Sequence, residues 1–144
     1  VIEFNARFGD PETEVLLPRL KTPLAQLLFA AATKNLNQFK SLEWSDESAV
    51  TVVLASEGYP SDAKVGYPIT GIKNTTNSFV YHAGTKFEDG ILKSSGGRVL
   101  TVTGIGNNLS EARNNAYENI SAITLQGSFY RNDIALSASQ LGKS

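Results

Sequence analysis

The chain has 144 residues, 41% of them hydrophobic, which is enough to bury one core and to form one domain or slightly more. A net charge of −1 excludes a nucleic-acid-binding protein. The longest apolar stretch, residues 23–32, is too short to span a membrane. The lack of cysteine excludes disulfides and thiol chemistry and is typical of a reducing compartment, so we expect a cytoplasmic protein.

The first eight residues alternate apolar and polar side chains without a break, which predicts a β-strand. One face suits a core and carries Ile2, Phe4, Ala6 and Phe8. The other face carries a carboxylate, an amide and a guanidinium in a row, from Glu3, Asn5 and Arg7. Because the pattern begins at Val1 without a methionine, we expect a piece cut from a longer protein.

Two helices are predicted after this strand. Gly9 permits a turn, Asp10 is the expected cap, and Glu12 falls in the first turn of a short helix that runs through Leu17. Thr22 and Pro23 repeat the signal before a longer amphipathic helix. Its expected buried face consists of Leu24, Leu27, Leu28 and Ala31.

The chain turns polar over residues 35–48, which predicts a boundary between domains at 1–45 and 46–144. Beyond it we expect strands at residues 49–56, 69–72, 79–82, 91–93 and 98–103. A turn is predicted at 88–90, between the third and fourth of these strands, and another at 104–106.

One strong helix is predicted after these strands, capped by Ser110 and ended by Gly127, with a frayed tail from Ser137. Its buried face is expected to carry Ala112, Ala116, Ile120 and Ile123. The second part is therefore predicted to be an α+β unit, a small, mostly antiparallel sheet with a covering helix.

The polar face of the first strand is the best candidate for chemistry. Glu3 and Asn5 offer the hard oxygen ligands that Mg²⁺ prefers, and Arg7 offers a fork that suits a carboxylate or a phosphate. The alternative reading is an ordinary solvated strand face with incidental polar residues.

The segment Glu3-Phe4-Asn5-Ala6-Arg7-Phe8-Gly9-Asp10-Pro11-Glu12 resembles the signature of the phosphoribosylamine–glycine ligases, also called glycinamide ribonucleotide synthetases, of the ATP-grasp superfamily. Further segments resemble landmarks of that family in the same order, at residues 53–60, 81–86, 96–100 and 130–134.

This resemblance implies that residues 1–45 are the end of an ATP-grasp domain and residues 46–144 the C-terminal domain of the ligase. The family joins glycine to 5-phosphoribosylamine in purine biosynthesis. ATP phosphorylates the glycine carboxylate, and the amine attacks the resulting glycyl phosphate. The adenine pocket and the phosphoribosylamine site of the family lie upstream of Val1, so we expect this chain alone to be inactive.

The resemblance also implies the roles of single residues. Glu3 and Asn5 map onto the ligands of Mg²⁺ or Mn²⁺, and Arg7 maps onto the catalytic arginine that contacts the acyl substrate or its phosphate. Asp10 and Glu12 are candidate substrate-binding residues, although helix capping and the helix dipole alone would explain both of them.

Other readings stay open. The chain could be a docking or oligomerisation module that forms a homodimer through the unpaired edge of its first strand. The parent could also be another ATP-grasp carboxylate–amine ligase. His82 is expected to be a structural residue, and Gly96-Gly97-Arg98 is either an approach to a phosphate or a tight connection with a surface arginine.

Overall fold

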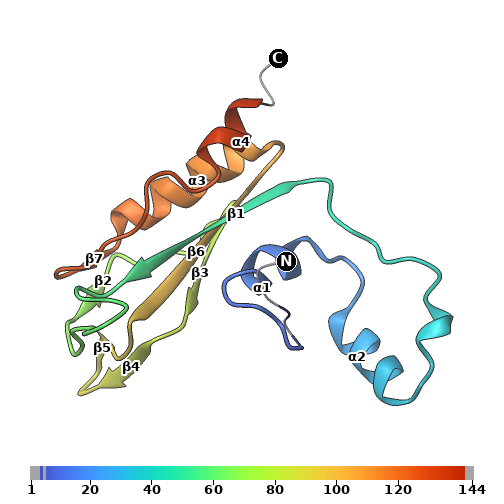
Figure 1. Ribbon diagram of the computed structural model, residues 1–144, viewed down its shortest axis with the longest axis horizontal. Helices are drawn as coiled ribbons and strands as arrows, with labels where there is room; N and C mark the ends of the chain where they lie inside the picture. Colours follow the sequence, from blue (N-terminus) through green and yellow to red (C-terminus); the bar gives the residue numbers. More distant parts are fainter. Residues whose placement is uncertain (1–3, 5, 142–144) are drawn as a thin grey trace.

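A three-stranded antiparallel sheet forms the centre of the computed structural model, which describes residues 4 and 6–141 (Figure 1). Its strand order is β1–β6–β3, where β1 is Ser48–Ala55, β3 is Ser78–His82 and β6 is Arg98–Gly106. Helix α3, Leu109–Ala122, packs against β6 and β1 and covers one face. The predicted α+β class with a mostly antiparallel sheet and a covering helix is confirmed.

The core lies between this sheet and α3. Val52 and Val80 both stand opposite Val102, so three β-branched side chains form one row across the sheet. The predicted face of α3 meets them, since Ala112, Ala116 and Ile120 are fully buried and Ile123 nearly so. Small alanines bring the helix close to the strands, and the branched side chains fill the space around them.

Two small two-stranded sheets extend this unit. Strands β4, Thr85–Glu88, and β5, Ile91–Ser94, form a hairpin around Asp89 and Gly90, so the turn predicted there is confirmed. Strand β4 was not predicted, and the strand predicted at residues 79–82, β3, pairs with β6. The other pair joins β2, Ile69–Thr70, to β7, Thr124–Leu125.

The end of α3 and the tail differ from the prediction. The helix stops at Ala122, because the chain turns extended at Ile123 to form β7. Gly127 instead takes a positive φ of 70° in the turn that follows β7. The described part of the tail expected to fray forms helix α4, Leu136–Leu141, and packs against α3 with Ser139 buried, while residues 142–144 lie outside the described residues.

The N-cap of α3 is Asn108 and not Ser110. The Asn108 side-chain oxygen accepts a hydrogen bond from the backbone N–H of Glu111 at 2.9 Å. The Glu111 carboxylate in turn accepts one from the backbone N–H of Asn107 at 2.9 Å. This reciprocal pairing satisfies two backbone donors around the start of the helix and places Ser110 inside it.

The Asn108→Ala variant should lower the free energy of unfolding by about 1 kcal/mol, because it removes this cap. The Ser110→Ala variant should change it by less than about 0.5 kcal/mol, because Ser110 lies within the helix. Urea unfolding of the 144-residue chain, followed by circular dichroism, measures both. Equal losses in the two variants would contradict the assignment of Asn108 as the cap.

Gly104 and Gly106 lie inside β6 and do not form the turn predicted for residues 104–106. A Cβ atom on Gly104 would overlap the carbonyl oxygen of Ala112 and the backbone N–H of Ala116. One on Gly106 would lie 2.8 Å from the backbone nitrogen of Ala112. Both glycines are therefore needed for the close approach of α3 to the strand.

The first part of the chain lies on the other face of the sheet (Figure 1). Helix α1, Thr13–Leu16, continues into the 3₁₀ helix η1, Leu17–Arg19, so Pro18 lies within the helical segment. The Thr103 hydroxyl donates a hydrogen bond to the carbonyl oxygen of Glu14 at 3.0 Å. Because Thr103 alternates with the core residue Val102, this contact places α1 opposite α3.

Helix α2, Leu24–Ala32, lies away from the sheet and contacts the 3₁₀ helix η2, Leu36–Gln38 (Figure 1). The face predicted for burial is largely wrong, since Leu28 is 54% exposed and Ala31 is exposed. Ala30 is the fully buried residue of this helix. An apolar stripe identifies side chains that share a face, but it does not supply an element to cover them.

None of the helices in the described part of the chain has the length and apolarity needed to cross a membrane. The boundary between residues 45 and 46 stays a prediction.

Candidate functional site

The segment that carries the sequence signature does not form the predicted strand over residues 4 and 6–8. Phe4 is 91% exposed and Phe8 is 51% exposed, so the core face expected for them is wrong. A strand requires a hydrogen-bonded neighbour, and within the described ranges no other strand pairs with this segment. The candidate metal ligands Glu3 and Asn5 lie outside the described residues.

Arg7 presents an exposed guanidinium. Among the described residues it donates one hydrogen bond, to the carbonyl oxygen of Phe8 at 3.2 Å. That local bond leaves most of its donors turned to solvent, where they suit a carboxylate or a phosphate.

Asp10 is not the cap of α1, contrary to the prediction. The helix begins at Thr13 with Glu12 in the N-cap position, and the Glu12 side chain makes no capping hydrogen bond. The Glu12 carboxylate lies against Gly9, where a Cβ atom would come within 2.5 Å of Oε2. Asp10 instead pairs with Arg98, with 3.3 Å between its Oδ1 and Nη1 of the guanidinium.

Arg98, the first residue of β6, connects the signature segment to the sheet. Its Nη1 also donates to the carbonyl oxygen of Asp10 at 3.0 Å, and its Nε donates to the Tyr59 hydroxyl at 2.9 Å. The hydrogen bond to Tyr59 and the charge of Asp10 raise the pKa of Arg98. The sequence singled out Gly96-Gly97-Arg98 without indicating this partner, which lies 88 residues away.

A cavity of about 490 Å³ opens between the α1–η1 segment and β3. Its lining consists of Thr13, Glu14, Leu17, Pro18, Tyr81 and His82. The Glu14 Oε2 atom is buried and has no hydrogen-bond partner among the described residues. His82 forms a hydrogen bond through Nδ1 with the Thr85 hydroxyl at 3.0 Å, which supports a structural role for this residue.

Burial raises the pKa of Tyr81, and the negative charge of Glu14 raises it further. The folded state therefore holds the phenol proton more tightly than the unfolded state does. The contribution of the neutral Tyr81 phenol to stability is complete below about pH 10 and falls as pH rises through the folded-state pKa.

The Glu14→Gln variant should lower the pKa of Tyr81 and leave it above 10, since burial is the larger cause. An NMR titration of the Tyr81 ring measures it, and an unchanged pKa would exclude the influence of Glu14.

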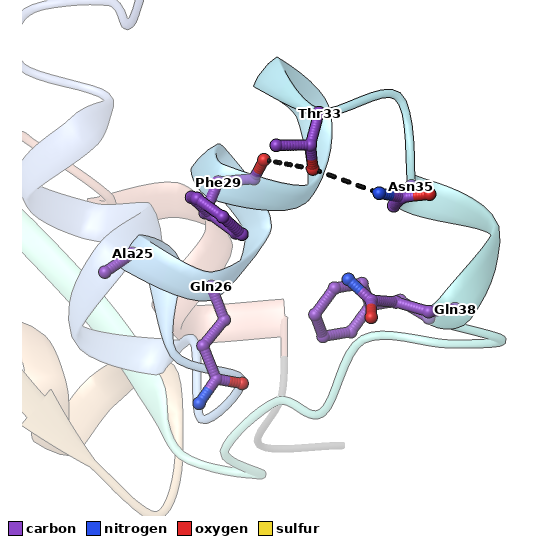
Figure 2. Close-up of a pocket in the computed structure, with 7 residues that line it drawn as sticks. Ala25, Gln26, Phe29, Thr33, Asn35 and Gln38 are labelled. Carbon is purple, nitrogen blue, oxygen red and sulfur yellow. Dashed lines mark hydrogen bonds between the residues drawn. The ribbon is translucent and has the colours of Figure 1, made fainter.

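A second cavity, of about 440 Å³, lies between α2 and η2 (Figure 2). Its lining consists of Ala25, Gln26, Phe29, Thr33, Asn35, Gln38 and Phe39. Figure 2 shows the hydroxyl of Thr33 tied to the Phe29 carbonyl oxygen, at 2.8 Å, and to the Asn35 amide, at 3.3 Å. Phe29 is 71% exposed, so this cavity presents apolar surface.

Within residues 4 and 6–141, no three histidine, cysteine, aspartate or glutamate side chains group closely enough to hold a metal ion. A metal site built on Glu3 and Asn5 would draw on residues outside those ranges.

Comparison with known proteins identifies the class of this chain. Residues 49–137, more than half of the sequence, match the family model described as "Phosphoribosylglycinamide synthetase, C domain". The chain belongs to this family. Its relatives include the phosphoribosylamine–glycine ligase of Streptomyces coelicolor, with 55% identity over 143 residues, covering 96% of this chain and 34% of that protein.

Two further comparisons agree. The phosphoribosylamine–glycine ligase of Mycobacterium tuberculosis is 52% identical over 97% of this chain and 33% of its own length. The crystal structure of phosphoribosylamine–glycine ligase from Thermotoga maritima matches with a TM-score of 0.74 and 36% identity, covering 94% of this chain and 33% of that one. The chain thus spans about a third of the relatives that it matches.

Proposed function

We propose that this chain is part of an ATP-dependent ligase that joins glycine to 5-phosphoribosylamine in cytoplasmic purine biosynthesis. The observation that carries the proposal is the 55% identity, over 96% of the chain, to a phosphoribosylamine–glycine ligase. The alternative of a different carboxylate–amine ligase finds less support, because the relatives from Streptomyces and Mycobacterium are named for the same reaction.

In this proposal the signature segment binds the reacting groups. Glu3 and Asn5 would hold Mg²⁺ or Mn²⁺, because a carboxylate and an amide oxygen are the hard donors that such ions prefer. The ion, when bound, neutralises the phosphates of ATP and aligns them for transfer.

Three further residues would act on the substrate. The exposed guanidinium of Arg7 would bind the glycine carboxylate and then the phosphate formed on it, which offsets negative charge as the phosphoryl group arrives. Asp10 and Glu12 follow on the same segment, and substrate binding by either stays a prediction. The structure gives the Asp10 carboxylate a different partner, Arg98.

A hybrid ligase tests the proposal. It joins this chain to the remaining two thirds of the Streptomyces coelicolor enzyme, replacing the part that matches. We expect ADP formation that requires both glycine and 5-phosphoribosylamine, and growth without added purine in a strain that lacks its own ligase. A hybrid that unfolds in one cooperative transition and yet forms no ADP would contradict the proposal.

We expect that the isolated 144-residue chain does not bind Mg-ATP tightly, because the resemblance to the ligase family implies an adenine pocket upstream of Val1. Isothermal titration calorimetry measures this directly. Tight binding would show that the nucleotide site is contained in this chain.

A second candidate function, docking or oligomerisation, is favoured by apolar surface on the first part of the chain. Among its described residues, the exposed large hydrophobic side chains are Phe4, Phe8, Leu16, Leu28, Phe29, Leu36, Leu42 and Trp44. Such a concentration is typical of an interface. Sedimentation velocity of the isolated chain distinguishes a homodimer from a monomer, and a strict monomer at high concentration would count against self-association.

A further inference from the structure

We propose that Arg98 is a positioning residue, which acts through Asp10 to hold the Phe8–Glu12 loop against the sheet and so orients Arg7 for the reaction. This inference rests on the proposed function for its effect on turnover. The contact itself is a property of the fold and has a separate test.

The backbone around Arg98 is closely packed. A Cβ atom on Gly84 would lie 2.6 Å from the Arg98 carbonyl oxygen and 2.8 Å from the Cα of Gly96. A Cβ atom on Gly97 would overlap the ring of Tyr59. The backbone at Gly84 and the backbone of Gly96–Arg98 therefore lie in direct contact, and the Tyr59 ring packs on Gly97, approaches that glycine permits.

Hydrogen bonds hold the Gly96-Gly97 segment in place as well. The Ser56 hydroxyl donates to the Gly96 carbonyl oxygen at 3.0 Å, and the Ser56 N–H donates to that of Gly97 at 2.9 Å. Tyr59 accepts from Arg98 Nε, and the guanidinium carbon lies 6.0 Å from the centre of its ring. With Nε so engaged, the planar fork has a set direction, and its Nη1 points to the loop.

The guanidinium of Arg98 contacts two atoms of one loop residue, Asp10. Nη1 of Arg98 lies 3.0 Å from the Asp10 carbonyl oxygen and 3.3 Å from its Oδ1. The side chains of Arg98 and Asp10 are 39% and 55% exposed, so the ion pair alone is weak. Its geometric effect is larger than its energy suggests, because the same donor group fixes both the backbone and the side chain of Asp10.

The position of Asp10 explains why this contact matters for chemistry. Asp10 lies three residues after Arg7 and three before Thr13, where α1 begins. On the helix side the loop is tied to the sheet by the hydrogen bond from Thr103 to Glu14. On the side of Arg7, the loop is held by the contact between Arg98 and Asp10. A displacement of about 1 Å at a reacting group can reduce turnover about 100-fold, so a loose loop would lower the rate without unfolding the domain.

Kinetics of the hybrid ligase test the effect on turnover. The Arg98→Met variant should reduce kcat about 10- to 100-fold with less than about a twofold change in the KM for ATP. Arg98→Lys should recover part of the loss, because the ammonium keeps the charge without the fork. The control is Arg131→Met, which breaks the exposed Arg131–Asp133 pair and should leave kcat unchanged.

A double-mutant cycle tests whether Arg98 acts through Asp10. If it does, the Arg98→Met/Asp10→Asn double variant should lose no more activity than Arg98→Met alone. Losses that multiply would show that the two residues act independently and would overturn the proposed route. An unchanged kcat in Arg98→Met would overturn the positioning role altogether.

Hydrogen exchange on the 144-residue chain tests the contact without reference to any activity. The amides of Gly9, Asp10, Glu12 and Thr13 should exchange faster in Arg98→Met than in the unmodified chain or Arg131→Met, while those of β6 and α3 should not change. Equal exchange in the loop would overturn the proposal. If the unmodified hybrid ligase were folded but inactive, the proposed function would fail, and the exchange experiment would still decide whether Arg98 holds the loop.

Discussion

Replacing Glu3 with Gln in the hybrid ligase should reduce kcat by about 100-fold or more. The substitution keeps the size of the side chain and removes one negative charge, which is the charge that would attract the divalent ion. Since phosphoryl transfer depends on neutralising the charge of the phosphates, the loss should appear mainly in kcat and in the dependence on metal concentration.

Manganese binding gives a readout besides turnover. Titration of the hybrid ligase and ADP with Mn²⁺, followed by electron paramagnetic resonance, should show weaker binding in Glu3→Gln. The matched control is Glu47→Gln, which removes the same charge from an exposed side chain that accepts a hydrogen bond from the Ser45 hydroxyl. Normal turnover and normal Mn²⁺ binding in Glu3→Gln would exclude Glu3 as a ligand.

The parts of the fold that depend on local pattern were predictable. Strand β1 follows the run of β-branched residues from Ala49, and the buried face of α3 follows the spacing from Ala112 to Ile123. Both elements pack against partners within this chain, so pattern and burial agree. The resemblance at residues 3–12 likewise depends on consecutive residues and needs no knowledge of the fold.

The prediction was wrong where an element needs a partner that the pattern does not reveal. Phe4 and Phe8 alternate as in a strand but stay exposed, and the Leu24–Ala31 stripe of α2 is only partly covered. Periodicity specifies which side chains share a face. Burial depends on a second surface, whose presence is a property of the tertiary structure.

Local competition explains the misplaced caps. Asn108 and Ser110 are both good N-cap residues, and the choice between them depends on where β6 ends and on the pairing of Glu111 with Asn107. Asp10 is a good cap by type, yet Arg98 takes its carboxylate from 88 residues away. Such a long-range pairing leaves no periodic signal in one sequence.

Gly104→Ala should lower the free energy of unfolding of the 144-residue chain by about 3 kcal/mol or more, the upper range for an overpacked core. Its new methyl group would overlap the backbone of α3 at Ala112 and Ala116, and backbone atoms cannot move aside as a flexible side chain can. The helix would have to shift away from β6, which would open the core around Val102 and Ile120.

A matched glycine separates this steric cost from the ordinary cost of replacing glycine. A methyl group on Gly66 would meet no atom within 4 Å, but Gly66 holds a φ of +90°, so Gly66→Ala should lose only about 1–2 kcal/mol, from backbone strain. Urea unfolding of both variants, followed by circular dichroism, compares them. Gly104 has no positive φ, so backbone strain adds nothing to the loss of stability in Gly104→Ala. If that loss were no larger than the loss in Gly66→Ala, α3 could withdraw from β6 at little cost. The close contact between the helix and the strand would then contribute little to the stability of this fold.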